Sequence, residues 1–230
     1  MIRLTKFGTT FTGTARDLER LRVTFNQNHY IRLPQLIEPA LLNNVLNQVQ
    51  KAQFEPMVHG HIGTELCLRD SPPVYLLRFL ANNYQLFKIV ENITECRRIG
   101  CFAGRIYRVI PGAGHYDSWH DDLGETRLVA MSINLSPKPY SGGVLQLRDV
   151  SSEQVNEVTN IGIGDAILFR LAQQLRHRIT EVHGEMAKTA FAGWFQSKPD
   201  FRESLQELRK GIVSENDIKR ASIRGNAPYN

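Results

Sequence analysis

Two histidines and one aspartate of this sequence could together bind a metal ion. His120 and Asp122 lie two residues apart in the stretch IYRVIPGAGHYDSWHDD, residues 106–122. Residues i and i+2 of an extended strand project from the same face, so this imidazole and this carboxylate can reach one ion, while Asp121 points away. His177, in LRHRITEV further along the chain, is a second imidazole that could complete the set. Two histidines and one carboxylate suit non-haem Fe(II) with open coordination positions.

A second H-x-D in the same stretch offers a competing ligand pair. His115 and Asp117 have the opposite parity to His120 and Asp122, so on a continuous strand at most one of the two pairs faces the interior. His115 comes just after two glycines, where rigid positioning of a ligand is unfavourable. We therefore favour His120 and Asp122 and keep the other pair as the alternative.

Two further histidine arrangements could also contribute a ligand. His183, six residues after His177, could replace it as the distal ligand. His59 and His61 are also two apart and could share an ion, but they are interleaved with glycines, and a mobile loop is the more common reading of such a segment.

The elements that would position these residues are predicted to be short strands. From about residue 96 the sequence consists of short apolar runs separated by Gly, Pro, Ser and Asp, which favours an antiparallel sandwich or barrel over alternating strands and helices. The expected strands cover residues 100–109, 116–121, 127–135, 144–147, 166–169, 174–182 and 188–196.

Residues 1–95 are expected to support this sheet from one side. HYIRLPQLI predicts a strand, and an amphipathic helix is expected to begin at Glu38-Pro39. Residues 54–70 look irregular. The pattern from residue 71 to 93 is that of one helix, with an apolar stripe facing the core. That stripe comprises Tyr75, Leu76, Phe79, Leu80, Tyr84, Phe87 and Val90. ARDLERLRVTF, residues 15–25, could be a helix or a strand.

The length of 230 residues fits a single domain. Within it we expect a helical and mixed support region at 1–95, a β-rich core at 96–198 and a helical extension at 199–230. The extension reads as a helix through Leu208 followed by a second short helix at 214–221.

Composition excludes several classes of protein. The net charge is +5, but the basic residues are scattered among a similar number of acids, so the clustered surface of a nucleic-acid-binding protein is missing. The three cysteines are odd in number and show no C-x-x-C spacing, which argues against a disulfide framework and suits a reducing compartment. Neither a secretory signal nor a membrane span is evident, so we expect a cytoplasmic protein.

Residues 105–196 resemble the Fe(II)- and 2-oxoglutarate-dependent oxygenases, specifically their prolyl-4-hydroxylase-like branch. The matching pieces occur in the order of that family. They are Tyr107 with PG at 111–112, H-x-D at 120–122, RLVAMSINLS, GGVLQLRD at 142–149, GDAILF at 164–169, LRHRITEV at 175–182, and Lys188 followed by GWF at 193–195. Each piece alone would be weak, but their shared order makes the resemblance specific.

The resemblance implies a jelly-roll fold, that is, a cupin-like double-stranded β-helix. It also implies hydroxylation of a C–H bond with Fe(II), 2-oxoglutarate and O2, release of succinate and CO2, and stimulation by ascorbate. His120, Asp122 and His177 would hold Fe(II). Lys188 would bind the far carboxylate of 2-oxoglutarate, and Tyr107 would hydrogen-bond the same group.

Three other activities were weighed against this one. A non-catalytic cupin-like protein that binds a metal or small ligand has no need of a cation such as Lys188 opposite the metal. A nucleic-acid demethylase of the same superfamily would resemble a pattern with arginines after the distal histidine, where this chain has Trp194 six residues past Lys188. A halogenase lacks the carboxylate that Asp122 supplies.

The substrate is expected to be a small molecule or a free or peptidyl amino acid. Its identity depends on the loops around the barrel mouth, which we place at residues 54–70, 110–118 and 170–176. The sequence also leaves the oligomeric state open, with a homodimer through the carboxyl-terminal helices as one arrangement.

Overall fold

The computed structural model of the chain describes residues 1–152 and 154–199. The expected helical extension at 199–230, with its helices through Leu208 and at 214–221, therefore lies outside the described residues apart from its first position. Within the described ranges, no helix combines the length and the apolar character that crossing a membrane requires.

The amino-terminal part forms a small hairpin and four helices. The hairpin consists of β1 (Ile2–Thr5) and β2 (Gly8–Phe11), and helix α1 (Ala15–Asn28) follows it. A capping box between Thr14 and Asp17 satisfies the backbone amides at the start of α1, which decides the helix-or-strand ambiguity of that segment. Helix α2 (Pro39–Lys51) begins at the proline where the sequence predicted it.

The segment expected to form one long helix forms two, α3 (Pro72–Ala81) and α4 (Tyr84–Thr94). Asn82 causes the break, because its side-chain amide exchanges two hydrogen bonds with the backbone of Phe102, at 2.8 and 2.9 Å. Asn83 then caps α4 by accepting from two backbone amides in its first turn. Tyr75, Phe79 and Tyr84 are exposed, so the prediction that the whole stripe faces the core was wrong at these positions. Helix α3 buries Val74, Leu77 and Leu80 instead.

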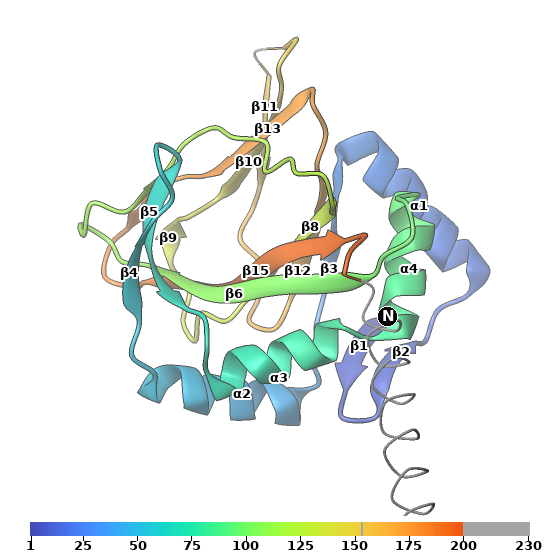
Figure 1. The fold of residues 1–230 in the computed structure, drawn as a ribbon, viewed down its shortest axis with the longest axis horizontal. Helices are drawn as coiled ribbons and strands as arrows, with labels where there is room; N and C mark the ends of the chain where they lie inside the picture. The colour runs from blue at the N-terminus through green and yellow to red at the C-terminus, as the bar shows by residue number, and fades with distance from the viewer. Residues whose placement is uncertain (153, 200–230) are drawn as a thin grey trace, which may run out of the picture.

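The larger of the two main sheets crosses the molecule above α2 and α3, while α1 and α4 lie at its end (Figure 1). Its order is β3-β12-β8-β15-β6-β5-β4, with β7 paired to β5. The bounds are β3 Tyr30–Leu33, β4 Glu55–Val58, β5 Gly63–Leu68, β6 Cys101–Val109, β7 Tyr116–Asp117, β8 Arg127–Asn134, β12 Ala166–Arg170 and β15 Lys188–Gln196. The strands β4 and β5 form a hairpin within residues 54–70. The prediction that this segment is irregular was therefore wrong.

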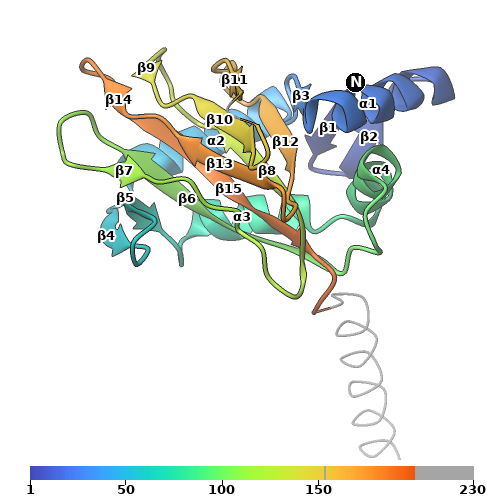
Figure 2. The same ribbon diagram turned by 90° about the horizontal axis from the view of Figure 1, so that it is seen from above.

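The smaller sheet, of order β11-β10-β13, packs over the larger one to form the double-stranded β-helix (Figure 2). Its strands are β10 (Leu145–Asp149), β11 (Val155–Val158) and β13 (Leu175–Ile179), and the short pair β9 (Ser141–Gly142) and β14 (Val182–His183) lies beside it. The predicted fold class, mainly β with supporting helices, is confirmed. Strand β11 was missed because VNEV carries one buried residue in an otherwise exposed run.

Alternation along β15 divides the two faces of the larger sheet between core and cavity. Phe191 and Phe195 point to the helices and are fully buried beside Phe102 of β6. The opposite face of β15 carries the small residues Ala190 and Ala192, which line a cavity. Large residues on the helix side therefore hold the sheet, and small ones on the other side leave room for a ligand.

This division predicts where the fold is sensitive to truncation. Phe191 is 0% exposed, so Phe191→Ala should lower the free energy of unfolding by about 3–5 kcal/mol through lost burial and a cavity. Phe79 is 72% exposed, and Phe79→Ala should change the free energy of unfolding by no more than about 0.5 kcal/mol. Chemical denaturation of both variants checks the difference. Equal effects would contradict the assignment of faces.

Candidate metal and cosubstrate site

A cavity of about 680 Å³ lies between the two sheets of the β-helix. Its floor is formed by residues of β6, β8 and β15, which include the small side chains of Ala130, Ser132, Ala190 and Ala192. His120, Asp122, His177, Tyr107 and Lys188 all line it. The structure thus brings every site residue predicted from sequence to one cavity.

The two histidines face each other across an isolated antiparallel bridge. The His120 backbone N–H donates to the His177 carbonyl at 3.0 Å, and the His177 N–H donates back at 2.8 Å. This pairing holds the imidazole centres 4.2 Å apart, and Phe169 packs edge-on against the His177 ring at 4.9 Å. The backbone, rather than the side chains alone, therefore sets the spacing of the two imidazoles.

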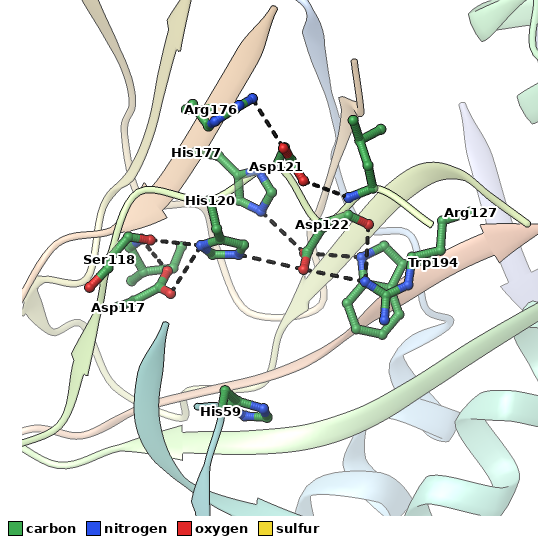
Figure 3. A network of polar contacts seen from close by, with 12 residues as sticks. His59, Asp117, Ser118, His120, Asp121, Asp122, Arg127, Arg176, His177 and Trp194 are labelled. Carbon is green, nitrogen blue, oxygen red and sulfur yellow. Dashed lines mark hydrogen bonds and ion pairs between the residues drawn. The ribbon is translucent and has the colours of Figure 1, made fainter. Parts of the chain in front are cut away.

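Asp122 reaches the histidines by a route other than the continuous strand that the sequence suggested. Strand β7 ends at Asp117, only His120 makes a bridge, and Asp122 has a φ of 56°, in the left-handed region. Aspartate tolerates this conformation better than most residues. Asp121 turns outward to Arg176 at 3.2 Å, as expected (Figure 3).

The geometry and donor set of these three residues fit a metal ion. Asp122 Oδ2 lies 3.2 Å from His177 Nε2, and Asp122 Oδ1 lies 3.6 Å from His120 Nε2. Ligands about 2.1 Å from one ion and at right angles to each other lie about 3 Å apart, so small adjustments would admit an ion. Among the described residues, only this group of three or more His, Cys, Asp or Glu gathers closely enough for that role.

Hydrogen bonds orient the His120 ring for such a role. Nδ1 donates to the Ser118 carbonyl at 2.7 Å, which turns Nε2 toward Asp122. Asp117 lies 3.5 Å from the same Nδ1, and its other oxygen accepts from the Ile179 N–H of β13 at 2.6 Å. Asp117 thus links the two histidine-bearing segments from outside the cluster, although the sequence offered it only as a rival ligand.

The charges of the cluster are strongly coupled. Burial by itself works to lower the pKa of His120, but the hydrogen bonds that its ring donates to the Asp122 carboxylate and to the Ser118 carbonyl outweigh burial and raise the pKa to about 9. For Asp122 burial works to raise the pKa, and the two histidines outweigh it and hold the pKa far below its usual range. The carboxylate is therefore held ionised between two imidazoles, as a metal ligand must be.

Two further residues hold the Asp122 carboxylate from the opposite side (Figure 3). The Trp194 indole Nε1 donates to Asp122 Oδ2 at 3.1 Å. The Arg127 guanidinium lies 3.5 Å from Oδ1 of the same carboxylate and also donates to the Asp122 backbone carbonyl at 3.0 Å. Arg127 also stacks 3.7 Å from the centre of the Trp194 ring. Trp194 belongs to the GWF piece of the resemblance, but nothing in the sequence indicated that its nitrogen would bind Asp122.

Lys188 is a buried cation with few partners. Its side chain is 6% exposed, and its ammonium donates to the Gly143 carbonyl at 2.5 Å. No carboxylate of the described residues forms an ion pair with it. Gly143 has a φ of 61°, and a Cβ there would lie 2.9 Å from Lys188 Cδ, so glycine is what allows the close approach. Burial lowers the pKa of Lys188 to about 8.

Tyr107 lies near Lys188 on the same floor. Its register partner on β15 is Ala190, two residues from Lys188. Burial raises the pKa of the phenol well above its usual range, and Ser132 hydrogen-bonds it. Tyr107 thus lines the cavity as predicted, with Ser132 rather than the Lys188 ammonium as its partner.

The alternative histidines make other contacts. His115 Nδ1 accepts from the Ile110 N–H at 3.0 Å, which closes the loop before β7. His183 is exposed on β14, and His61 is exposed in the β4–β5 loop. His59 lies apart from the cluster (Figure 3), with Glu65 and Arg105 at 3.0 and 3.2 Å.

Comparison of the sequence with protein families gives one match. Residues 104–196 match the model of the 2OG-Fe(II) oxygenase superfamily. This span begins at β6 and ends with β15, so it contains all five predicted site residues. No curated protein sequence matches the chain.

Solved structures share the fold at low sequence identity. An oxidoreductase of the 2OG-Fe(II) oxygenase family from Burkholderia pseudomallei superposes with a TM-score of 0.63 at 13% identity, over 83% of this chain and 95% of that one. A Pseudomonas putida prolyl-4-hydroxylase gives 0.60 at 13% identity, over 79% and 100%. A Trichoplax adhaerens prolyl hydroxylase, in complex with a hypoxia inducible factor oxygen degradation domain peptide fragment, gives 0.57 at 16% identity, over 81% and 95%.

Proposed function

We propose that this chain, which belongs to the 2OG-Fe(II) oxygenase superfamily through residues 104–196, is a hydroxylase. It would hydroxylate a C–H bond of a small molecule or of a free or peptidyl amino acid. The family uses Fe(II), 2-oxoglutarate and O2. These supply the oxidation when bound, with one oxygen atom of O2 entering succinate and the other the product, and with CO2 released. The chain's own part is to hold these reactants and to position the substrate.

His120, Asp122 and His177 would hold Fe(II). Their donor atoms meet at the cavity wall, the Asp122 carboxylate is ionised, and the Ser118 carbonyl accepts from Nδ1 of His120 and so directs Nε2 toward Asp122. Three protein ligands on one side of an ion leave the other positions to small oxygen ligands. This set therefore suits a metal that must bind a cosubstrate as well as the protein.

Lys188 is the observation that carries the cosubstrate assignment. A lysine ammonium has three donors, and only the Gly143 carbonyl accepts from it within the described ranges. Burying such a group without a counter-charge is costly, so the site is incomplete until an anion enters. The far carboxylate of 2-oxoglutarate would supply that anion, and Tyr107 beside it would line the same end of the cavity.

The neighbouring structures are compatible with either class of substrate. One of them is a prolyl hydroxylase described in complex with a peptide fragment, and another belongs to the 2OG-Fe(II) oxygenase family without a stated substrate. Their identities to this chain are too low to transfer a substrate.

Turnover of 2-oxoglutarate tests the proposed function. Purified protein with Fe(II), ascorbate and 2-oxoglutarate should form succinate under air, and more of it when a substrate is added. Protein that binds a divalent ion but neither binds 2-oxoglutarate nor forms succinate would instead be the cupin-like binding protein considered above.

Trp194→Phe tests whether the indole nitrogen supports the metal site. Phenylalanine keeps an aromatic ring but removes the donor to Asp122, so the affinity for Fe(II) should fall by about 10–100-fold. Anaerobic calorimetric titration with Fe(II) measures it. Trp119→Phe is the matched control, because Trp119 stacks between Arg148 and Arg178, at 4.5 and 4.7 Å, away from the cluster. An unchanged affinity in Trp194→Phe would remove this residue from the site.

A further inference from the structure

Arg105 is a cation that lines the cavity in addition to Lys188, and the proposed function does not use it. It lies on β6 with the same parity as Tyr107, and its side chain is 20% exposed. Its register partner on β15 is Ala192, whose methyl group leaves the space beside the guanidinium open. Arg105 is thus placed on the floor of the site rather than at the surface.

The guanidinium of Arg105 is only partly used by its neighbours. Arginine has five N–H donors, and here Nε donates to Glu65 Oε1 at 2.7 Å. His59 Nε2 lies 3.2 Å from one terminal nitrogen of Arg105 and 3.0 Å from Glu65, and it can serve only one of the two at a time. The other terminal nitrogen, Nη1, has no hydrogen-bond partner within residues 1–152 and 154–199. A pair of donors therefore faces the cavity in the arrangement that receives a carboxylate.

Glu65 keeps Arg105 charged and in place. Burial works to lower the pKa of Arg105, but the charge and hydrogen bond of Glu65 outweigh it and raise the pKa above its ordinary value. Glu65 is held between Arg105 and His59 and is itself largely buried. The cluster of Arg105, Glu65 and His59 is a preformed anchor rather than a flexible surface charge.

The position of Arg105 places this anchor beside the metal site and away from Lys188. The Arg105 guanidinium lies 6.0 Å from the centre of the Trp194 ring, whose nitrogen donates to Asp122. Along β15, the partner of Arg105 is Ala192, four residues from Lys188, which corresponds to about 13 Å of extended strand. Arg105 is therefore a cationic position of the cavity separate from Lys188, and 2-oxoglutarate needs only the one at Lys188.

We propose that Arg105, held by Glu65 and His59, binds a carboxylate of the substrate, so that the compound oxidised is a compact anion. The proposal rests on the proposed function for the identity of the reaction. The reacting C–H group would lie only a few bonds from the anchored carboxylate, because Arg105 lies 6.0 Å from the centre of the Trp194 ring and the Trp194 nitrogen lies 3.1 Å from Asp122. A free carboxylic acid and a carboxylate of a peptide share this chemistry.

A matched pair of probes tests the charge requirement. The protein is loaded with Zn(II) and saturating 2-oxoglutarate, and its tryptophans are labelled with ¹⁵N. The chain has two tryptophans, so two indole signals are expected, and Trp119→Phe identifies that of Trp194. Pentanoate and its uncharged analogue pentanamide are titrated in turn while the Trp194 signal is followed.

Pentanoate should bind at least about tenfold more tightly than pentanamide, and Arg105→Gln should abolish the difference. Arg105→Lys keeps the charge but loses the planar guanidinium, so it should retain part of the preference for pentanoate. This variant also tests the proposal if Arg105→Gln does not fold. Arg69→Gln, at an exposed arginine of the same cavity, should behave as the wild type. Equal binding of both probes, binding of neither, or a preference that survives in Arg105→Gln would each overturn the proposal.

Two controls separate this site from the cosubstrate site. The affinity for pentanoate must not depend on the concentration of 2-oxoglutarate, since competition would place the probe at Lys188. Arg105→Gln should also retain the wild-type KM for 2-oxoglutarate in substrate-free succinate formation, and a KM raised tenfold or more would assign Arg105 to the cosubstrate. A wild type that forms no succinate but prefers pentanoate would reject the proposed function and leave the anion site in place.

The source of the carboxylate is decided by turnover. Free carboxylic acids and peptides ending in a carboxylate are compared, each with its amide counterpart, for stimulation of succinate formation. Stimulation by the acid and not by its amide, in either series, identifies the source. Stimulation by amides as strong as by acids would contradict the anchor.

Discussion

Replacement of either His120 or His177 by alanine is expected to reduce succinate formation to the background of metal-free protein. Each change removes one of the three donors that converge in the cavity, and the remaining two would hold a divalent ion weakly. His115→Ala removes a histidine that only closes a loop, so activity should stay within about threefold of the wild type. Succinate assays at saturating 2-oxoglutarate, with bound iron measured on the same samples, check the three variants.

The opposite pattern would reverse the ligand assignment. If His115→Ala abolished turnover and bound iron while His120→Ala retained both, the ion would belong to the alternative H-x-D. Asp117 would then have to leave the Ile179 N–H, to which it is bound at 2.6 Å, and that would show as local loss of amide protection in β13.

Lys188→Ala is expected to raise the KM for 2-oxoglutarate by about 100-fold while iron binding is retained. The variant removes the buried cation that would pair with the far carboxylate, and loss of one partner of a buried charge pair costs about 2–5 kcal/mol. Lys138→Ala is the matched control, because Lys138 is exposed on the connection before β9. Initial rates at varied 2-oxoglutarate concentrations give both KM values, and an unchanged KM in Lys188→Ala would exclude this residue from the cosubstrate site.

The pH dependence of the same reaction should reveal the loss of the proton from the Lys188 ammonium. With the pKa lowered by burial to about 8, the free protein carries the charge below that pH and loses it above. A dianion binds the charged form, so kcat/KM for 2-oxoglutarate should fall as the pH rises through about 8. In Lys188→Ala this decline should disappear, and a decline that persists there would point to another group.

The β-core was predictable because residues that face the core and residues that face the cavity alternate along its strands. In KTAFAGWFQ the two phenylalanines face the helices, while Lys188, Ala190, Ala192 and Trp194 line the cavity, so the strand and its inward residues follow from the alternation. The same holds for the inward His177 between the outward Arg176 and Arg178 of β13, which contact Asp121 and Gln146. The expected ligand residues could be named once the strands were recognised, and the structure brings them close together.

The missed features depend on contacts between distant segments. The break between α3 and α4 arises because Asn82 binds Phe102, twenty residues further on, and no periodicity within the helix signals it. The β4–β5 hairpin was missed because HGHIG looks like an irregular loop, although the flanking residues pair with each other and with β6. Trp194 and Arg105 form hydrogen bonds with Asp122 and Glu65, which lie far away in sequence. Local patterns predict elements, whereas these contacts are properties of the assembled barrel.

The left-handed backbone conformation of Asp122 determines which residues could replace this aspartate without strain. Its φ of 56° is a conformation that glycine adopts freely and alanine does not. A change from Asp122 to glycine would therefore delete the carboxylate without straining the loop, while the bridged histidine pair stays in place. In the proposed site, that substitution would leave one more position on the ion to an exogenous anion at little conformational cost.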